Sequence, residues 1–276
     1  MFPRRIAALR FAPALRWPAA RRGFSLVELL VVVAVVAMLL AILAPSLTAA
    51  RRQARQVKCA SHLRQLAVAF HMYAQDHDGR ALPLAYFKQW PLVYWWGKDT
   101  PGGVDHTCGM TAPYLASDLA ADSVFECPEQ AWGSYAPQGE AKGVTSTYGY
   151  NGYYLTPAQT PGWERYIGHR PWQTLDSMPA PQRVFVFADT LLELPGAGGA
   201  NTALLDPPWL LGRRGWSENP YPTTSFRHAG RTNAAHADGH VAARLPGDGR
   251  VTSQELRIGS VGAQNDPHYV PDWREW

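Results

Sequence analysis

The residues that could do chemistry near the C-terminus are histidines and aspartates. They offer imidazole nitrogens and carboxylate oxygens, which are donor types that zinc accepts. The candidates are His228, His236, Asp238, His240 and, further upstream, Asp189. The order His-x-Asp-Gly-His is no established zinc pattern, so side chains that stabilise turns are the simpler interpretation. The sequence holds no Ser-His-Asp order, phosphate loop, HExxH or CxxC motif, and we expect no enzyme.

Turn signals position these residues. Asp238-Gly239 separates two short runs that favour strands, and this dipeptide predicts a two-residue hairpin, because a type I′ turn needs positive φ at both central positions. Arg227-His228-Ala229-Gly230 predicts an earlier turn. We therefore expect the chemical residues of this segment on turns between antiparallel strands.

A second chemical feature is Glu28, a lone carboxylate at the edge of an apolar run that extends to Ala44. An unpaired carboxylate in hydrocarbon costs at least ~2.5 kcal/mol, so its position points to a function. The run from Leu26 to Ala44 has nineteen residues, close to the length that crosses a bilayer. Six arginines and no acid precede it: Arg4, Arg5, Arg10, Arg16, Arg21 and Arg22. A basic tail followed by an apolar run is typical of membrane targeting.

Two interpretations of this region compete. A secretory signal would be cut after a small-residue site such as Ala49-Ala50, which removes the run and leaves Glu28 unexplained. The alternative retains the run and cuts before it, between Gly23 and Phe24. Only the second interpretation accounts for both the long basic tail and the glutamate.

The segment Gly23-Phe-Ser-Leu-Val-Glu-Leu-Leu30 resembles the processing motif of type IV pilins and type II secretion pseudopilins. The resemblance implies that a prepilin peptidase cuts after Gly23 and methylates the new amino terminus at Phe24. It also implies that Glu28 neutralises the amino group of Phe24 on a neighbouring pilin-like subunit in a filament core. Pairing of this kind makes a charge tolerable out of water.

The distribution of charge along the chain predicts both its partners and its topology in the membrane. Removing residues 1–23 takes away six arginines and leaves 20 basic against 22 acidic residues, so we expect no nucleic-acid partner. Six basic residues precede the apolar run and four follow it closely: Arg51, Arg52, Arg55 and Lys58. The positive-inside rule places the N-terminus in the cytoplasm and the head on the other side of the membrane. The resemblance implies a single span in the inner membrane and a periplasmic head.

Beyond the apolar run the helical pattern continues, with no glycine or proline between Pro45 and Gly79. An apolar face repeats at 4, 3, 4, 3 spacing through Cys59, Leu63, Leu66, Phe70 and Tyr73. We predict one nearly continuous helix over 25–75. The predicted parts of the chain are a leader, a transmembrane or filament-core helix, its amphipathic extension and a globular head: 1–23, 24–45, 46–78 and 79–276.

Two further segments resemble a large bacterial group of prepilin-type proteins. Residues 59–79 are similar to its Cys-x-x-Asn-Leu-x-Gln-Leu stretch, with His62 in place of asparagine. Residues 225–241 are similar to its C-terminal signature of histidine, nine residues and Asp-Gly, in which His236 replaces a bulky apolar residue. The matching positions are His228, Gly230, Asn233, Asp238, Gly239 and His240.

The resemblance also concerns cysteines and calcium. Three cysteines allow at most one internal disulfide, and the group often has cysteines at the places of Cys59 and Cys127. A Cys59–Cys127 disulfide is thus implied, with Cys108 free, and three buried unpaired thiols are the alternative. Some pseudopilins bind calcium in a C-terminal loop. Oxygen donors for it here are Asp206, Asp238, Asp248 and Asp266, although no spacing selects among them.

For the head we predict a mostly antiparallel sheet. Loops rich in proline and glycine separate the strand candidates, and strands do not alternate with helices as they do in βαβ units. The predicted strands are 123–127, 146–155, 183–188, 224–227, 233–237 and 240–244, with Val184–Phe187 buried at the centre. Aromatic residues around Trp95 and Trp96 form core or, alternatively, a platform that stacks on sugars.

We therefore expect an α+β protein with a long N-terminal helix packed on an antiparallel sheet. The function implied by the resemblance is that of a pilin-like subunit, which assembles into or primes a type IV pilus-like filament or a type II secretion pseudopilus. The alternative is a membrane-anchored extracytoplasmic glycan-binding protein or metal-dependent enzyme that uses the pilin targeting route.

Overall fold

The structure of the chain is a computed structural model. It describes residues 23–86, 92–101, 103–115, 123–130, 146–157, 170, 172–194, 196, 198–212 and 214–272, and the basic leader with its six arginines lies outside them. The chain forms two compact units, residues 1–48 and 49–276. The boundaries predicted for the leader, the two helix segments and the head stay predictions.

The predicted long helix is confirmed as α1 (Leu26–Asp76), a single element of 51 residues with Pro45 inside it. At 1.5 Å per residue it is about 75 Å long. In the N-terminal unit every residue from 23 to 48 is exposed, and this part of α1 is long and apolar enough to cross a membrane.

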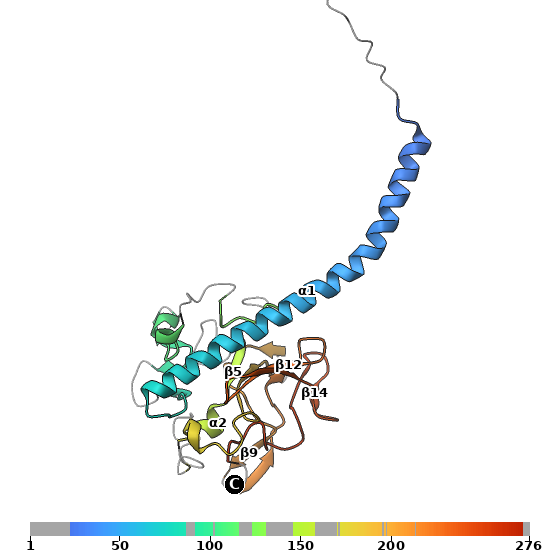
Figure 1. Cartoon of the computed structure of the whole chain (residues 1–276). Helices are drawn as coiled ribbons and strands as arrows, with labels where there is room; N and C mark the ends of the chain where they lie inside the picture. The colour runs from blue at the N-terminus through green and yellow to red at the C-terminus, as the bar shows by residue number, and fades with distance from the viewer. Residues whose placement is uncertain are drawn as a thin grey trace, which may run out of the picture. The chain divides into compact units, whose positions relative to one another are not determined.

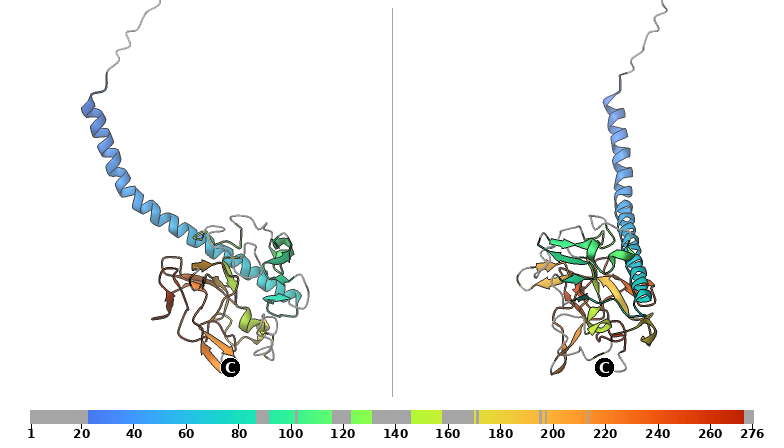
Figure 2. Two further views of the ribbon diagram at one scale, coloured as in Figure 1. Left: turned by 180° about the vertical axis from the view of Figure 1, so that it is seen from behind. Right: turned by 90° about the vertical axis from the view of Figure 1, so that its left-hand side faces the viewer.

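In the C-terminal unit, α1 buries the predicted apolar face. Its buried residues are Cys59, His62, Leu63, Leu66, Ala67, Ala69, Phe70, Tyr73 and Ala74. The helix ends as predicted, because the Gly79 N–H donates to the carbonyl of Ala74 and Gly79 has a φ of 75°. Figures 1 and 2 show this part of α1 lying along the strands of the head.

The central sheet has the order β13-β12-β6-β5 and is antiparallel throughout. Its strands are β5 (Tyr148–Tyr150), β6 (Phe185–Asp189), β12 (Thr232–His236) and β13 (Val241–Arg244). β6 is wholly buried, as the apolar run predicts. Its Val186 and Phe187 join the core beneath α1, whereas Phe185 and Ala188 join a second core with Phe226 and Tyr269. The sheet is therefore covered on both faces.

Smaller antiparallel sheets surround this core. One has four strands, β1 (Ala85–Tyr86), β2 (Val93–Tyr94), β3 (Gly97–Thr100) and β4 (Gly103–Asp105). A three-stranded sheet joins β11 (Thr224–Ser225), β15 (Ile258–Gly259) and β14 (Val251–Ser253). Two hairpins pair β7 (Leu192–Leu194) with β8 (Gly198–Ala200), and β9 (Trp209–Gly212) with β10 (Gly215–Glu218). The α+β class with mostly antiparallel sheets is thus confirmed.

Three strand predictions were wrong in part. Residues 123–127 form turns instead of a strand, because the Cys127 N–H donates to the Thr147 hydroxyl rather than to a ladder. The predicted strand 146–155 is β5 followed by the short helix α2 (Gly152–Leu155). The predicted strand 224–227 ends with β11, since the chain turns at Arg227.

The Asp-Gly hairpin between β12 and β13 is present, but its turn differs from the prediction. Gly239 has a φ of 88° whereas Asp238 lacks positive φ, which excludes a type I′ turn. The Gly239 N–H donates to the His236 carbonyl, and the His236 N–H donates to the His240 carbonyl. These bonds make a three-residue loop that ends in a left-handed glycine.

The aromatic cluster is core where the structure describes it. Trp95 is fully buried and its indole N–H donates to the Ala203 carbonyl, while Trp96 is 7% exposed. Neither ring offers a free face to a sugar.

Candidate functional site

The residues of the predicted processing site lie at the start of α1. Gly23 and Phe24 precede the helix and are exposed, and a side chain at Gly23 would meet no atom within 4 Å. Ser25 caps the helix, because its hydroxyl accepts the Glu28 N–H at 3.2 Å. In return the Glu28 carboxylate accepts the Ser25 N–H at 2.9 Å. The two residues form a capping box, and its sequence signal, Ser-x-x-Glu, was missed.

Glu28 is therefore satisfied locally within its own chain. A carboxylate offers about four acceptor positions, and the Ser25 N–H uses one of them. Room remains for an ammonium group, so the capping box does not exclude the intermolecular partner that the resemblance implies.

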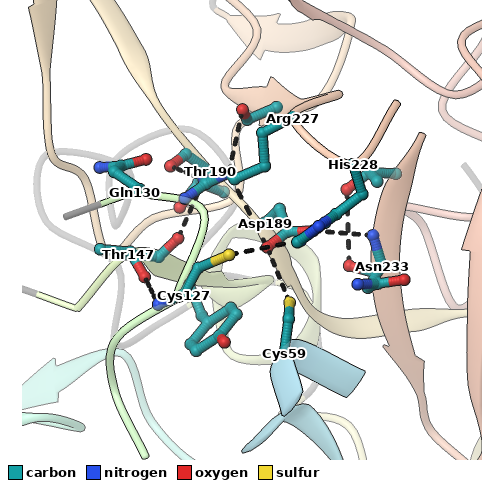
Figure 3. Close-up of polar contacts among 12 residues, drawn as sticks. Cys59, Cys127, Gln130, Thr147, Asp189, Thr190, Arg227, His228 and Asn233 are labelled. Atoms are coloured by element: carbon teal, nitrogen blue, oxygen red, sulfur yellow. Dashed lines mark hydrogen bonds and ion pairs between the residues drawn. The ribbon is translucent and has the colours of Figure 1, made fainter. Parts of the chain in front are cut away.

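The strongest constellation in the head is a buried cluster of Cys59, Cys127, Asp189 and His228. One ligand-type atom from each of these side chains lies within 4.8 Å of all the others. The four come from separate parts of the chain: the buried face of α1, the loop before β5, the end of β6 and the turn after β11. Figure 3 shows both thiols and the imidazole ring directed toward the Asp189 carboxylate.

Asp189 is the centre of the cluster. Its Oδ1 accepts the Cys59 thiol at 3.3 Å, and its Oδ2 accepts the Asn233 N–H at 2.8 Å and lies 3.4 Å from His228 Nε2. Arg227 Nε lies 3.9 Å from Oδ1. Burial alone would raise the pKa of Asp189, but the Arg227 charge and the bonds from His228 and Asn233 outweigh it and hold the pKa below its ordinary value.

Cys127 and His228 form the second contact of the cluster, with 3.3 Å between Sγ and Nε2. Burial opposes the charge of each, but their partners outweigh it. Hydrogen bonds that its ring donates to Asp189 and Cys127 raise the pKa of His228 to about 10. Bonds from Cys59 and His228, with the Arg227 charge, lower the pKa of Cys127 to about 6. These shifts favour a negative charge on Cys127 and a positive charge on His228.

Arg227 closes the cluster on one side. Its Nη2 donates to the Thr190 carbonyl at 2.5 Å and to the Thr147 carbonyl at 3.2 Å. Thr147 also accepts the Cys127 N–H at 2.6 Å through its hydroxyl. Arg227 and the loop that carries Cys127 are thus anchored on the same residue.

The helix holds that loop from the other side. His62 Nδ1 lies 2.8 Å from the Glu126 carbonyl oxygen and donates to it, one helical turn from Cys59. Cys59 and His62 therefore face the same loop.

The C-terminal signature residues contact α1 at two places. His228 lies in the cluster that contains Cys59, and the Gly239 carbonyl accepts a bond from Arg64. Asn233 reaches Asp189 through its backbone, and Gly230 has a φ of 81° in the turn. The nine residues between the histidine and Asp-Gly, 229–237, contain a turn and the strand β12. The residues that flank this segment lie beside Cys59 and Arg64 of the helix.

The other histidines predicted as zinc donors lie elsewhere. His236 stacks on His240 with ring centroids 3.9 Å apart, and its Nε2 lies 3.1 Å from Arg244. His240 bonds to Asp238 at 2.6 Å, as turn stabilisation predicts. Of the five donors considered from the sequence, the cluster contains only His228 and Asp189, and the two cysteines complete it. For these two cysteines, the resemblance implies a disulfide instead.

The structure places Cys59 and Cys127 together but holds both as free, buried thiols, and Cys108 as a free, exposed one. The disulfide stays a prediction. The calcium expectation also stays one, since Asp206, Asp238, Asp248 and Asp266 are not gathered into a metal-binding group within the described part of the chain.

Comparisons with known proteins match a part of the chain. Residues 18–44 match the family model of the prokaryotic N-terminal methylation motif, and these residues include Gly23, Phe24 and Glu28. The chain is 39% identical over 57 residues to the type IV wide pilus major component PilA4 of Thermus thermophilus. That stretch covers 21% of this chain and 44% of the relative, so the chain spans less than half of the relative's length. No solved structure matches the chain.

Proposed function

We propose that this type IV pilin-like protein is a subunit of a type IV pilus-like filament or of a secretion pseudopilus. A prepilin peptidase cuts it between Gly23 and Phe24 and methylates Phe24. Its apolar helix then leaves the inner membrane and joins those of other pilin-like subunits. The N-terminus is cytoplasmic before processing, and the head is periplasmic. The head acts in assembly, without catalysis and without binding nucleic acid.

One observation carries this proposal: the motif from Gly23 to Glu28 stands at the start of an apolar helix whose side chains are all exposed to residue 48. Such a surface is stable only when lipid or other apolar side chains cover it. The match to the methylation motif supports processing at this place. The name of the relative, a major pilus component, supports assembly.

Glu28 supports the filament rather than a passive anchor. A membrane anchor alone has no use for a carboxylate at the edge of its apolar run, where it costs at least ~2.5 kcal/mol unpaired. The capping box offsets only part of this cost, because the charge remains. A neighbouring subunit's Phe24 amino group would neutralise it.

Processing is tested by intact mass measurement of the chain from membranes that contain a prepilin peptidase. We expect loss of residues 1–23 and addition of a methyl group. Gly23→Val should keep the leader. An added Cβ at Gly23 meets no atom within 4 Å, so the fold gives no reason to expect damage from this change other than lost cleavage. Ala50→Val, on the exposed surface of the same helix, is the matched control. Normal cleavage of Gly23→Val would contradict the proposed site.

The alternative function receives no such observation. The two tryptophans proposed to stack on sugars are in the core, and the four residues of the cluster in the head are all buried.

A further inference from the structure

We propose that Cys59, Cys127, Asp189 and His228 bind a zinc ion that fastens the long helix to the head. The site would be of the structural kind, with two sulfur ligands, one nitrogen and one oxygen, and it goes beyond the proposed role of the chain in assembly.

The spacing of the four donor atoms fits a tetrahedral ion. With ligand bonds of about 2.0 to 2.3 Å, adjacent ligand atoms around zinc lie about 3.3 to 3.8 Å apart. The contacts in the cluster are 3.3 Å from Cys59 Sγ to Asp189 Oδ1, 3.3 Å from Cys127 Sγ to His228 Nε2, and 3.4 Å from that nitrogen to Asp189 Oδ2. The other pairs of ligand atoms lie within 4.8 Å of one another, so small shifts of these side chains would bring one atom of each residue to this spacing.

The donor types favour zinc over a harder cation. Thiolate sulfur and imidazole nitrogen are ligands of zinc, whereas calcium and magnesium take oxygen. The four side chains come from four separate segments and all are buried, which is the arrangement of a closed structural site.

The charges around the cluster also balance. Two thiolates, one carboxylate and a divalent ion carry a net charge of −1, which the buried guanidinium of Arg227 neutralises from 3.9 Å. Part of the second layer is in place as well, around Asp189 and Cys127, whereas His228 Nδ1 has no hydrogen-bond partner among the described residues. The Asn233 N–H fixes Asp189 at 2.8 Å, and the Thr147 hydroxyl fixes the backbone of Cys127 at 2.6 Å. Such partners orient the ligands of a metal.

A zinc ion at this site would link four segments of the chain that are distant in sequence. The ion would join residue 59 of α1 to residues 127, 189 and 228 of the head. Its release would remove this link, while the buried apolar face of α1 and the bond from His62 to the loop would remain. A disulfide between the two cysteines would exclude the ion, because it consumes both thiolates.

The test is metal analysis of the full chain in mild detergent, purified under a thiol-free reductant, dialysed against zinc and then freed of excess metal. We expect a single zinc ion per chain in the wild type and in Cys108→Ser, the exposed cysteine outside the cluster. Cys127→Ser and His228→Ala should lose zinc to background.

A cobalt(II) spectrum of the wild type keeps the test decisive if these variants misfold. Tetrahedral coordination with sulfur gives intense visible bands and thiolate-to-metal charge transfer, and we expect both. Binding only after reduction of a Cys59–Cys127 disulfide would also support the site and would identify its oxidised competitor. No zinc in the reduced wild type, or zinc retained in both ligand variants, would overturn the proposal.

Discussion

Glu28 and Asp189 are two carboxylates whose surroundings differ in almost every respect. Glu28 is exposed, and its described contacts are to Ser25, three residues away. Asp189 is fully buried and receives contacts from segments that are 38 to 130 residues away in sequence. The first depends on a short contiguous motif and the second on the whole fold of the head. Changes at the two sites should therefore separate assembly from stability.

The largest effect on stability should come from Asp189→Ala. It leaves Arg227 and His228 buried without their carboxylate, and loss of one partner from a buried charge network costs about 3 to 5 kcal/mol. Thermal unfolding of the full chain in detergent, followed by tryptophan fluorescence, measures it. Glu28→Ala should leave the same transition unchanged, because Glu28 lies outside the head. Equal effects of the two variants would contradict the comparison.

A smaller effect should follow from pH at His236. Burial, with the charges of His240 and Arg244, lowers the pKa of His236 to about 3, whereas the unfolded chain binds the proton near 6.5. The stability contributed by neutral His236 is therefore present above about pH 6.5 and is lost as the pH falls toward 3. His236→Leu should lose less stability over this window, by up to a few kcal/mol. Identical pH profiles of variant and wild type would refute this origin.

Gly239→Ala tests the contact between the hairpin and the helix. Gly239 has a φ of 88°, and an added Cβ would lie 3.2 Å from His71 Nε2. The left-handed backbone alone costs about 1 to 2 kcal/mol. Gly262→Ala has nearly the same φ, 86°, but open space around its Cβ, with nothing closer than 3.9 Å. We expect a lower unfolding temperature for Gly239→Ala than for Gly262→Ala. Equal unfolding temperatures of the two variants would show that the contact between Gly239 and His71 of the helix does not affect stability.

The smallest effect should come from Arg55→Ala. Arg55 pairs with Glu129 at 3.1 Å, but its side chain is 52% exposed, and such surface pairs contribute about 0 to 1 kcal/mol. Arg51→Ala is the matched change on the same exposed helix surface. A difference above about 1 kcal/mol between the two unfolding free energies would show that the loop before β5 depends on this pair.

The sequence predicted the parts of the molecule that rest on local patterns. The apolar face from Cys59 to Tyr73, the stop at Asp76–Gly79 and the buried strand through Val186 were all found, because periodicity and turn residues are local signals. The Asp238-Gly239 hairpin was found with the wrong turn type, since the loop length depends on the pairing register. The Ser25–Glu28 capping box was available from spacing alone and was overlooked.

The cluster of the head could not be predicted in the same way. Asp189 and His228 were among the zinc donors considered, and Cys59 and Cys127 were paired by resemblance, but nothing local joins these two pairs. Their meeting depends on the order β12-β6-β5 and on the packing of α1 over it. Residues 123–127 show the same limit, because a bond from the Cys127 N–H to the Thr147 hydroxyl replaces the ladder that their composition favours.

The central claim is that Glu28 acts in assembly through its charge rather than through its cap. Glu28→Gln keeps an acceptor for the Ser25 N–H but removes the charge, whereas Ser25→Ala removes the capping hydroxyl and keeps the charge. The measurement is the amount of each processed variant in the filament fraction sheared from cells, relative to wild type. We predict that Glu28→Gln is processed but absent from filaments, and that Ser25→Ala is present. Filaments of normal yield from Glu28→Gln would contradict the account.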